Sequence, residues 1–276
     1  MIIKKETITS KSNSTVGLVT SLSEKKYRDR YGLFRTDGIK LAEEIFSRGI
    51  TPETVLLKES SAEKLLSRFS AVNSEAIIIS DALFDRISEE KSPEGVICII
   101  KYLDNLKKIV TIDNREVCPE GWETDRIMLL ESLRDPGNLG TVIRSATALS
   151  MERLVISSDC ADLYNPKTVR ASMGTLFGMK IDIVDSLPRA AEILKGLGRR
   201  VFAAALDREA VGLDALALES TDSFAVGNEG HGLSEEMLAV STGKVFIPIT
   251  EGAESLNAAA AAAILLWEHR RQTVKN

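Results

Sequence analysis

The second half of the chain alternates short apolar strands with helices, and this alternation restricts the fold more than any other feature. Apolar runs of three to five residues indicate buried strands, and segments with a helical apolar period separate them. The predicted strands are Ile127–Leu130, Leu154–Ile156, Ile181–Val184, Val201–Ala205, Phe224–Val226 and Val245–Ile247. Strands of this kind, joined by helices, form a mostly parallel sheet that helices cover on both faces. The sequence therefore predicts an α/β fold for this half.

The first half also alternates helices and strands, in a smaller α/β layer arrangement. Helices are predicted at Gly38–Gly49, Ala62–Phe69 and Ser80–Ile87, and extended segments at Thr54–Leu57, Ala76–Ile79 and Val96–Ile100. Between the halves, the polar stretch Asp104–Asp125 contains Pro119 and Gly121 and breaks the pattern. We therefore predict two domains, residues 1–118 and residues 119–276.

Composition excludes several classes of protein. The net charge of -5 over 276 residues gives no global basic field, although a local basic face is compatible with an acidic total. Three scattered cysteines and two histidines, without metal-ligand spacing, predict no metal site, no disulfide framework and a reducing, cytoplasmic compartment. No apolar run approaches 18 residues, so we predict no membrane span, and the N-terminus predicts no signal peptide.

Ligands bind beyond the carboxyl ends of parallel strands, so the segments that follow the strands are the candidate sites. After the first strand, Asp135–Gly137 predicts a tight turn, and Asn138 is predicted to cap the next helix. Arg144 would lie on the helix face opposite the buried residues. These two residues could also be no more than a cap and a solvated side chain.

Two further strands end in polar loops. Gly227–Ser234 holds three glycines, which permit close backbone approach, but it matches neither nucleotide-binding fingerprint. Glu229 in this loop is either a carboxylate at a ligand site or an ordinary loop acid. The last strand leads to Ser255 and Asn257, either of which can cap a helix that begins with six consecutive alanines. Small alanine side chains allow another backbone to pack closely against that helix.

These three loops together resemble the SpoU family of S-adenosylmethionine-dependent RNA 2′-O-ribose methyltransferases. The resemblance covers roughly residues 126–268 and rests on three motifs in order, DPGNLGTVIRSA, VGNEGHGLS and IPITEGAESLNAAAA. The segment Lys167–Phe177 (KTVRASMGTLF) also resembles a connecting helix of that family. The alanines after Asn257 replace the more usual Val-Ser of the family pattern.

The resemblance implies a deep trefoil knot, a homodimer formed through the knotted domain, and S-adenosylmethionine as the cofactor. It implies cofactor-binding residues Ala204, Gly227, Ile247 and Leu256, and catalytic residues Asn138, Arg144, Glu229, Ser255 and Asn257. In the family, the residue that matches Arg144 is proposed to take the proton of the ribose hydroxyl. Because a guanidinium is normally always protonated, Arg144 could instead grip the phosphate beside the target ribose. Both roles stay open.

The segment Ser21–Arg35 (SLSEKKYRDRYGLFR) is rich in basic and aromatic residues. It is either a solvated helix face or a phosphate-binding patch. The stretch Tyr27–Ile100 resembles the substrate-binding domain of many SpoU enzymes, which is similar to a ribosomal protein that recognises kinked RNA. We therefore predict ribosomal RNA as the substrate, with transfer RNA as the alternative; a non-catalytic RNA-binding protein or a small-molecule enzyme would be a different class. The predicted RNA contacts are Lys25, Arg28, Arg30 and Arg35.

Overall fold

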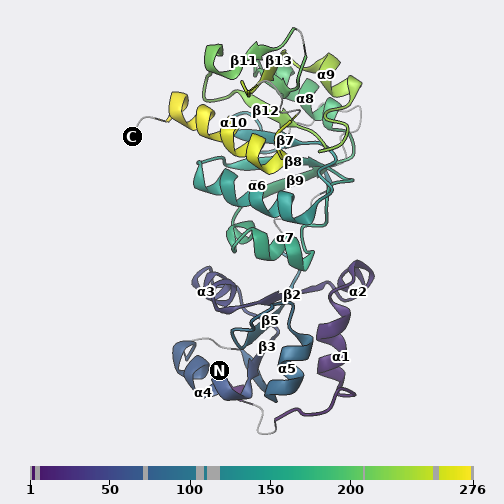
Figure 1. Cartoon of the computed structure of the whole chain (residues 1–276), viewed down its shortest axis with the longest axis vertical. Coiled ribbons are helices and arrows are strands. Elements are labelled where there is room, and N and C mark those ends of the chain that lie inside the picture. The colour runs from purple at the N-terminus through teal and green to yellow at the C-terminus, as the bar shows by residue number, and fades with distance from the viewer. Residues whose placement is uncertain are drawn as a thin grey trace. The chain divides into compact units, whose positions relative to one another are not determined.

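The structure of the chain is a computed structural model that describes residues 2–3, 7–70, 74–103, 109–110, 119–207, 209–250 and 255–274. Its contacts form two compact units (Figure 1), the first made of Met1–Leu103 with Asp162–Phe177 and the second of Asp104–Ala161 with Gly178–Asn276. The predicted boundary between residues 118 and 119 lies at the end of a segment outside the described residues. The contacts also place a stretch from within the second half, residues 162–177, in the first unit.

The described part of the first unit contains a five-stranded mixed sheet with the order β1-β4-β3-β5-β2. Neighbours β1, β4 and β3 run parallel, whereas β5 runs antiparallel to both β3 and β2. The strands are β1 (Ile2–Ile3), β2 (Leu33–Asp37), β3 (Thr54–Lys58), β4 (Glu75–Ile79) and β5 (Val96–Lys101). This sheet confirms the α/β prediction for the first half, with β2 as a strand that the apolar pattern did not reveal.

Helices of the first unit pack on this sheet through apolar stripes. Val19 of α1 and Phe84 of α5 join Leu56 and Ile77 of the sheet in one buried cluster. The helices are α1 (Ser14–Ser21), α2 (Lys25–Tyr31), α3 (Ile39–Ser47), α4 (Ala62–Arg68), α5 (Asp81–Ile87) and α7 (Pro166–Ala171), with 3₁₀ turns η1 (Glu59–Ser61) and η3 (Thr175–Phe177).

Aromatic packing explains why residues 162–177 belong to the first unit. Tyr164 stacks on Tyr102 with 4.0 Å between ring centroids and lies 4.7 Å from the ring of Phe34. The predicted helix Lys167–Phe177 is wrong in its length, because α7 ends at Ala171. Met173 and Gly174 then adopt positive φ angles of 51° and 85°, which a continuing α-helix cannot contain.

The described part of the second unit contains an eight-stranded sheet with the order β11-β13-β10-β12-β7-β8-β9-β6, parallel throughout. The strands are β6 (Ile109–Val110), β7 (Ile127–Leu130), β8 (Arg153–Ser157), β9 (Lys180–Val184), β10 (Val201–Ala204), β11 (Val211–Gly212), β12 (Ser223–Val226) and β13 (Gly243–Phe246). The predicted parallel sheet is confirmed.

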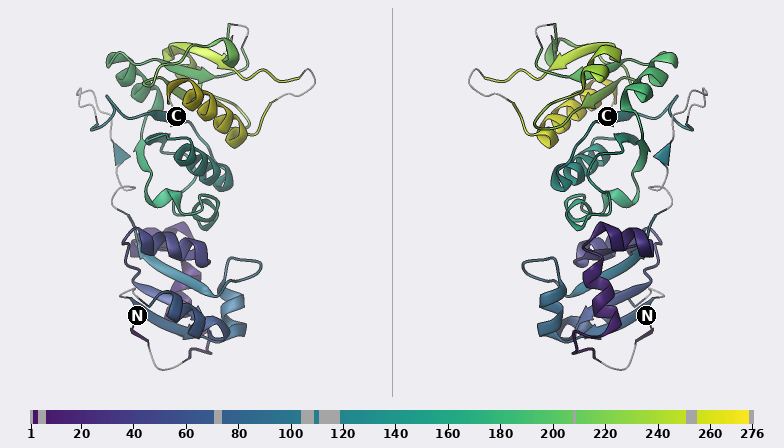
Figure 2. Two further views of the ribbon diagram at one scale, coloured as in Figure 1. Left: turned by 90° about the vertical axis from the view of Figure 1, so that its left-hand side faces the viewer. Right: turned by 90° about the vertical axis from the view of Figure 1, so that its right-hand side faces the viewer.

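Helices cover both faces of this sheet (Figure 2). Ile127 and Leu129 share one buried cluster with α8 and α9, and strand alternation turns Met128 to the opposite face. On that opposite face α6 and α10 pack against each other, and the ring of His269 in α10 meets Phe224 edge-on. Burial lowers the pKa of His269. The helices are α6 (Pro136–Ala148), α8 (Leu187–Gly196), α9 (Glu235–Val240) and α10 (Ala258–Thr273), with the 3₁₀ turn η4 (Leu213–Ala215).

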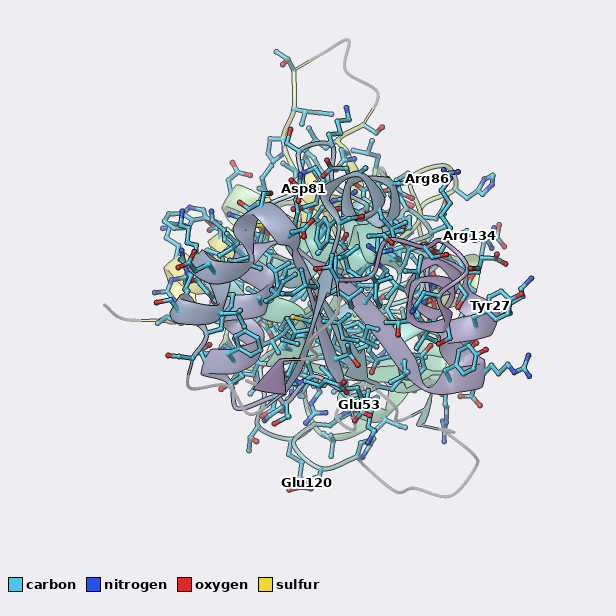
Figure 3. All side chains as sticks on the ribbon, turned by 90° about the horizontal axis from the view of Figure 1, so that it is seen from below. Tyr27, Glu53, Asp81, Arg86, Glu120 and Arg134 are labelled. Atoms are coloured by element: carbon cyan, nitrogen blue, oxygen red, sulfur yellow. The ribbon has the colours of Figure 1, made fainter. Side chains whose placement is uncertain are left out.

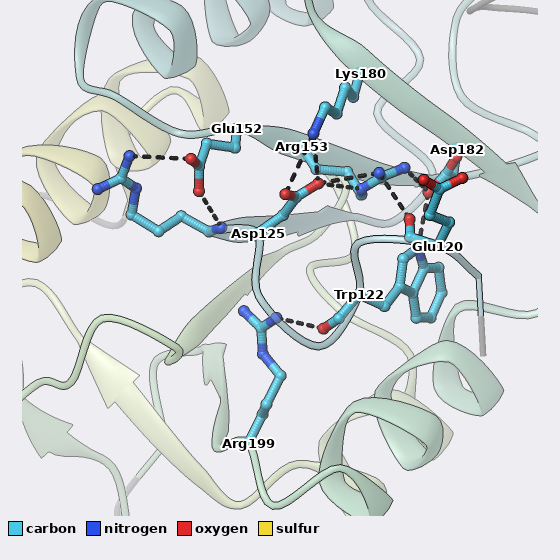
Figure 4. A network of polar contacts seen from close by, with 9 residues as sticks. Glu120, Trp122, Asp125, Glu152, Arg153, Lys180, Asp182 and Arg199 are labelled. Carbon is cyan, nitrogen blue, oxygen red and sulfur yellow. Dashed lines mark hydrogen bonds and ion pairs between the residues drawn. The ribbon is translucent and has the colours of Figure 1, made fainter.

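A polar network closes the amino ends of β7, β8 and β9 (Figure 4). Arg153, at the start of β8, donates to Asp182 at 2.6 Å, to Asp125 at 3.0 Å and to the carbonyl of Glu120 at 2.9 Å. The buried indole of Trp122 donates to the same Asp182 at 2.8 Å. Because each buried charge is paired and hydrogen-bonded, the network tolerates burial. It lies at the edge of the sheet opposite to the edge where ligands bind in folds of this kind.

No helix in the described ranges is both long enough and apolar enough to cross a membrane. The same residues contain no group of three His, Cys, Asp or Glu side chains that could hold a metal ion.

Candidate active site

Four neighbouring strands deliver the predicted site loops to one edge of the sheet. β13, β10, β12 and β7 lie side by side, and each ends at the carboxyl edge. In the sheet, β8 and β9 lie on one side of β7, whereas the later strands β10, β12 and β13 lie on its other side. The strand order therefore reverses beside β7, and such reversal points open a crevice for ligands in parallel sheets.

The first loop begins α6 differently from the prediction. Asp135, not Asn138, is the N-cap, and its carboxylate accepts from the backbone N–H of Asn138 at 2.8 Å. Pro136 occupies the first helical position, where its fixed φ suits the helix and no N–H is needed. The prediction of Asn138 as a cap is wrong, and the side chain of Asn138 is left to bond outside its own helix.

Asn138 joins all three motif loops through hydrogen bonds. Its Nδ2 donates to Oε1 of Glu229 at 2.6 Å, and its Oδ1 accepts from Nδ2 of Asn257 at 3.1 Å. Asn138 and Glu229 are 91 residues apart in sequence, and Asn138 and Asn257 are 119 apart. The sheet topology thus brings together three polar residues that the sequence placed in separate loops.

Asn257 is also the N-cap residue of α10. Its Oδ1 accepts from the backbone N–H groups of Ala259 at 3.0 Å and Ala260 at 3.3 Å. Of the two predicted caps, Asn257 is therefore the one used. Ser255 instead lines a neighbouring cavity. Since the cap fixes the amide plane of Asn257, its Nδ2 is held toward Asn138.

Two residues that position the loops were not predicted. Asn228 donates to the carbonyl of Ser132 at 2.8 Å, which ties the second motif loop to the first. The buried carboxylate of Glu131 accepts from Ser234 through both the hydroxyl, at 2.8 Å, and the backbone N–H, at 2.7 Å. Their position in the sequence was the available signal. Glu131 directly follows the buried strand β7, and Asn228 is the second residue after the buried strand β12.

A cavity of about 470 Å³ lies against these loops. It is formed by residues that follow β10, β12 and β13 and by the start of α10. The four predicted cofactor residues all line it, as do Glu229 and Ser255, and the full predicted group at its wall is Ala204, Gly227, Glu229, Ile247, Ser255 and Leu256. Its volume is within the range of small-molecule and cofactor sites, about 300–1,000 Å³.

The lining suits a ligand with an apolar planar part and polar ends. Leu206 and Leu256 line the cavity yet stay 65% and 37% exposed, which leaves apolar surface for a ligand to cover. Backbone groups of the strand-tip loops offer donors and acceptors, and Glu229 supplies a carboxylate. An adenosine moiety matches the apolar wall and backbone groups, and cationic groups of a ligand match the carboxylate.

Close packing shapes the second loop. A Cβ added to Gly227 would lie 2.2 Å from the carbonyl carbon and oxygen of Gly232. Asn228 and Gly232 exchange two backbone hydrogen bonds, at 3.0 Å and 2.9 Å, which hold these segments against each other. Only glycine fits at position 227 without moving the loop backbone.

Arg144 does not join the Asn138 cluster. Its side chain is exposed on α6, and within the described residues it has no hydrogen-bond or ion-pair partner. Six residues along an α-helix place Arg144 about 120° around the axis from Asn138. Within the described residues Glu229 bonds Asn138 and makes no bond to Arg144.

Hydrogen bonds among Ser132, Ser157 and Asp159 hold the loop after β7 in place. Ser132 adopts a positive φ of 53° and donates to Asp159 at 2.6 Å. Burial disfavours ionisation of Asp159, but hydrogen bonds from Ser132, Ser157 and Arg134 outweigh it and lower the pKa of this carboxyl. The ionised carboxylate stabilises an uncommon backbone conformation beside the first motif.

Two of the four predicted RNA contacts are buried in the first unit. Arg28 is 1% exposed and donates to Asp162 at 2.5 Å, and Arg35 is 1% exposed and forms a two-point ion pair with Asp37 at 2.9 Å and 2.6 Å. Neither guanidinium can reach an RNA backbone in this conformation, so the structure contradicts both predictions. Carboxylates, not solvent, pair with these charges: Asp162 is distant in sequence from Arg28, whereas Asp37 is two residues from Arg35.

The other two predicted contacts are on the surface. Lys25 forms an exposed pair with Asp29 at 2.8 Å, and the guanidinium of Arg30 lies 5.7 Å from the ring centre of Tyr31. Their part in RNA binding stays a prediction.

The fold and site define a parallel α/β protein that holds a cofactor-sized cavity at the carboxyl edge of its sheet. Residues 125–267 match the model of the SpoU rRNA Methylase family, and the chain belongs to that family. Residues 13–98 match the model of the MRM3-like substrate binding domain. The resemblance seen in the three motifs is confirmed.

Known proteins similar to this chain match nearly all of its length. The 23S rRNA (guanosine(2553)-2′-O)-methyltransferase RlmP of Bacillus subtilis is 29% identical over 95% of this chain and 98% of its own. The crystal structure of an RNA 2′-O ribose methyltransferase has a TM-score of 0.81 and 28% identity, covering 97% of this chain and 99% of its own. The AdoMet-bound rRNA methyltransferase of Sinorhizobium meliloti has a TM-score of 0.79 and 26% identity, with 98% of both chains covered.

Proposed function

We propose that this chain transfers a methyl group from S-adenosylmethionine to a ribose 2′-hydroxyl of ribosomal RNA. One observation carries the proposal: Asn138, Glu229 and Asn257, one from each SpoU motif, are hydrogen-bonded to one another beside a cofactor-sized cavity. The names of the similar proteins describe them as RNA methyltransferases. One similar structure contains bound AdoMet, which is S-adenosylmethionine. The enzyme is an S-adenosylmethionine-dependent RNA 2′-O-methyltransferase.

Different residues of the cavity would contact different parts of the cofactor. Ile247 and Leu256 would flank the adenine, and the backbone around Ala204 and Gly227 would bond its polar edge. Bound S-adenosylmethionine supplies an electrophilic methyl group on a positively charged sulfur. Glu229 places negative charge at the cavity wall, which favours a cationic ligand there.

The protein residues have to align the ribose hydroxyl and dispose of its proton. Asn138 holds the carboxylate of Glu229 and the amide of Asn257, so the loops that shape the cavity share one fixed geometry. Ser255 lies at the cavity wall, where its hydroxyl can contact substrate or cofactor. Arg144 is exposed and suits a two-point grip on the phosphate next to the target ribose.

Substitution of Arg144 distinguishes a phosphate grip from direct participation in proton transfer. Arg144→Lys keeps a cation but loses the planar two-point fork. For a phosphate grip we expect KM for RNA to rise about 10-fold, in line with a charge-assisted hydrogen bond, while kcat is partly retained. Steady-state kinetics with ribosomal RNA measure both. Near-total loss of kcat with unchanged RNA binding would instead favour proton transfer.

The proposed activity is tested by transfer of tritium from methyl-labelled S-adenosylmethionine. Purified 23S ribosomal RNA, 16S ribosomal RNA and transfer RNA are incubated separately with the enzyme and digested to nucleosides. We expect label in a 2′-O-methyl nucleoside from ribosomal RNA. Label only in transfer RNA would support the alternative substrate. No label in any RNA, with retained RNA binding, would support a non-catalytic binding protein.

The cytoplasmic location stays a prediction.

The proposal includes a trefoil knot and a homodimer formed through the second unit. The third-motif segment enters α10, where Ala258, Ala259 and Ala262 are buried and small enough for close crossing of the chain. On its other side, α10 exposes Ile264 at 38% and Trp267 at 57%, one helical turn apart. Exposed large apolar side chains in such a row suit a subunit contact.

We expect Trp267→Glu to convert the dimer into a monomer at micromolar concentration. Loss of a central tryptophan costs an interface about 2 kcal/mol or more, and a buried carboxylate adds to this. Sedimentation velocity measures the change. Trp267→Phe is the control that removes the indole without adding a charge, and Tyr31→Glu is the control that places the same charge at an exposed aromatic position of the first unit. A Trp267→Glu protein that stays dimeric would contradict the proposed interface.

A further inference from the structure

The first unit contains a hollow of about 450 Å³ that is separate from the site described above. Its apolar residues are Val16, Leu83 and Ile87, contributed by α1 and α5. Its polar residues include two cations, a carboxylate and a tyrosine, namely Lys11, Arg86, Glu24 and Tyr27. We refer to it as the α1–α5 hollow.

Charge at the α1–α5 hollow favours an anion. Glu24 is paired with Lys26 at 3.0 Å, so its charge is already offset from outside the hollow. The guanidinium of Arg86 is exposed and has no hydrogen-bond or ion-pair partner within the described residues. Figure 3 shows Tyr27 and Arg86 on the same side of the molecule, and both line the hollow. A planar aromatic group and a planar cation therefore lie at one apolar depression.

Tyr27 also connects the hollow to a row of exposed side chains along α2. Its ring is stacked with that of Tyr31, with centroids 6.4 Å apart and 14° between planes. Lys26 lies 4.7 Å from the centre of the Tyr27 ring, and Arg30 lies 5.7 Å from that of Tyr31. Tyr31 is 46% exposed. We call Lys26, Tyr27, Arg30 and Tyr31 the α2 stripe.

We propose that the α1–α5 hollow and the α2 stripe bind unstacked nucleotides of the substrate RNA, an inference that rests on the proposed function. One base enters the hollow against Tyr27 and the apolar floor, while Arg86 and Lys11 bind its phosphate. A neighbouring base stacks on Tyr31, with Lys26 and Arg30 along the backbone. Sequence-specific RNA recognition targets mainly unpaired, splayed-out bases, which stack on aromatic rings and arginine guanidinium groups. In a closed duplex the bases are not available for such stacking.

Binding of single-stranded RNA tests this site without catalysis. Fluorescein-labelled oligouridine is titrated with the full-length wild-type protein and variants, and anisotropy reports the Kd. We expect Tyr27→Ala and Arg86→Glu each to weaken binding about 10-fold, the effect of losing one stacking platform or one phosphate contact. Tyr27→Phe keeps the ring and should bind like the wild type. Lys64→Glu makes the same charge reversal on an exposed part of α4 and should also have little effect.

The outcomes separate this inference from the proposed function. Equal oligouridine binding by the wild type, Tyr27→Ala, Arg86→Glu and Lys64→Glu would overturn the inference, even if the wild type methylates ribosomal RNA. Failure of the wild type to methylate any RNA would overturn the proposed function but leave the binding result readable. Arg86→Glu changes an exposed side chain, so it reports on binding even if Tyr27→Ala lowers stability. A supporting result requires unchanged S-adenosylhomocysteine binding in both variants, because the cavity of the second unit is untouched.

Discussion

Gly227→Ala is expected to abolish cofactor binding and to lower the melting temperature of the protein. The added Cβ would lie 2.2 Å from the carbonyl of Gly232 and 2.4 Å from the backbone nitrogen of Leu233. These are backbone atoms, so no side-chain rotation relieves the contact, and the second motif loop has to move. Overpacking of this kind costs about 1–3 kcal/mol of stability. A displacement near 1 Å at a site wall can lower its activity by about 100-fold.

Calorimetric titration with S-adenosylhomocysteine and thermal unfolding measure the two effects of Gly227→Ala. Gly230→Ala is the matched control, because it adds the same methyl group to the same loop. Its Cβ would meet only the side-chain oxygen of Asn228, at 3.3 Å, which can shift slightly. Wild-type affinity and stability in Gly227→Ala would show that the loop is not fixed by this packing.

Asn138→Ala is expected to reduce methyl transfer about 100-fold while the fold is kept. The change removes the 2.6 Å bond to Glu229 and the 3.1 Å bond to Asn257 together, so the three motif loops lose their shared link. Misalignment at this scale typically has an effect of that size. The helix itself should persist, because its N-cap is the carboxylate of Asp135, which accepts from the backbone N–H of residue 138, and the substitution keeps that N–H.

Single-turnover methylation of ribosomal RNA at saturating cofactor measures the effect of Asn138→Ala. Thr141→Ala serves as the control, since Thr141 is exposed on the same helix and its hydroxyl donates to the carbonyl of Gly137 within that helix. Glu229→Ala should resemble Asn138→Ala, because each removes one end of the 2.6 Å bond. If both variants turn over like the wild type, the linked motif residues have no part in the reaction.

Apolar patterning predicted the central strands of the second sheet and the edge at which the site lies, but it missed the strands β1, β2, β6 and β11. Strands such as β7 and β12 are buried on both faces, so their continuous apolar runs are plain in the sequence. The cap of α6 was predicted wrongly because Asp135 and Asn138 are both good cap residues. Pro136 was the deciding signal, since proline favours the first helical position.

Long-range pairing explains what the sequence pattern could not predict. Arg28 looks like a surface cation within a basic run, but its partner Asp162 lies 134 residues further on. Glu131 and Asn228 act on other loops, and their bonds exist only once the sheet is assembled. Local patterns predict what a segment prefers, whereas these roles depend on which distant segment it meets.

The packing of Tyr164 has a consequence for dissecting the protein. The polypeptide passes between the two units three times, after residues 103, 161 and 177, so no single cut releases either unit whole. A fragment that begins at residue 119 would retain Tyr164 and Phe177 but lack Phe34 and Tyr102, which cover them in the intact chain. Such a fragment would present bare aromatic rings to solvent, and self-association of that product would report on the cut and not on the catalytic fold.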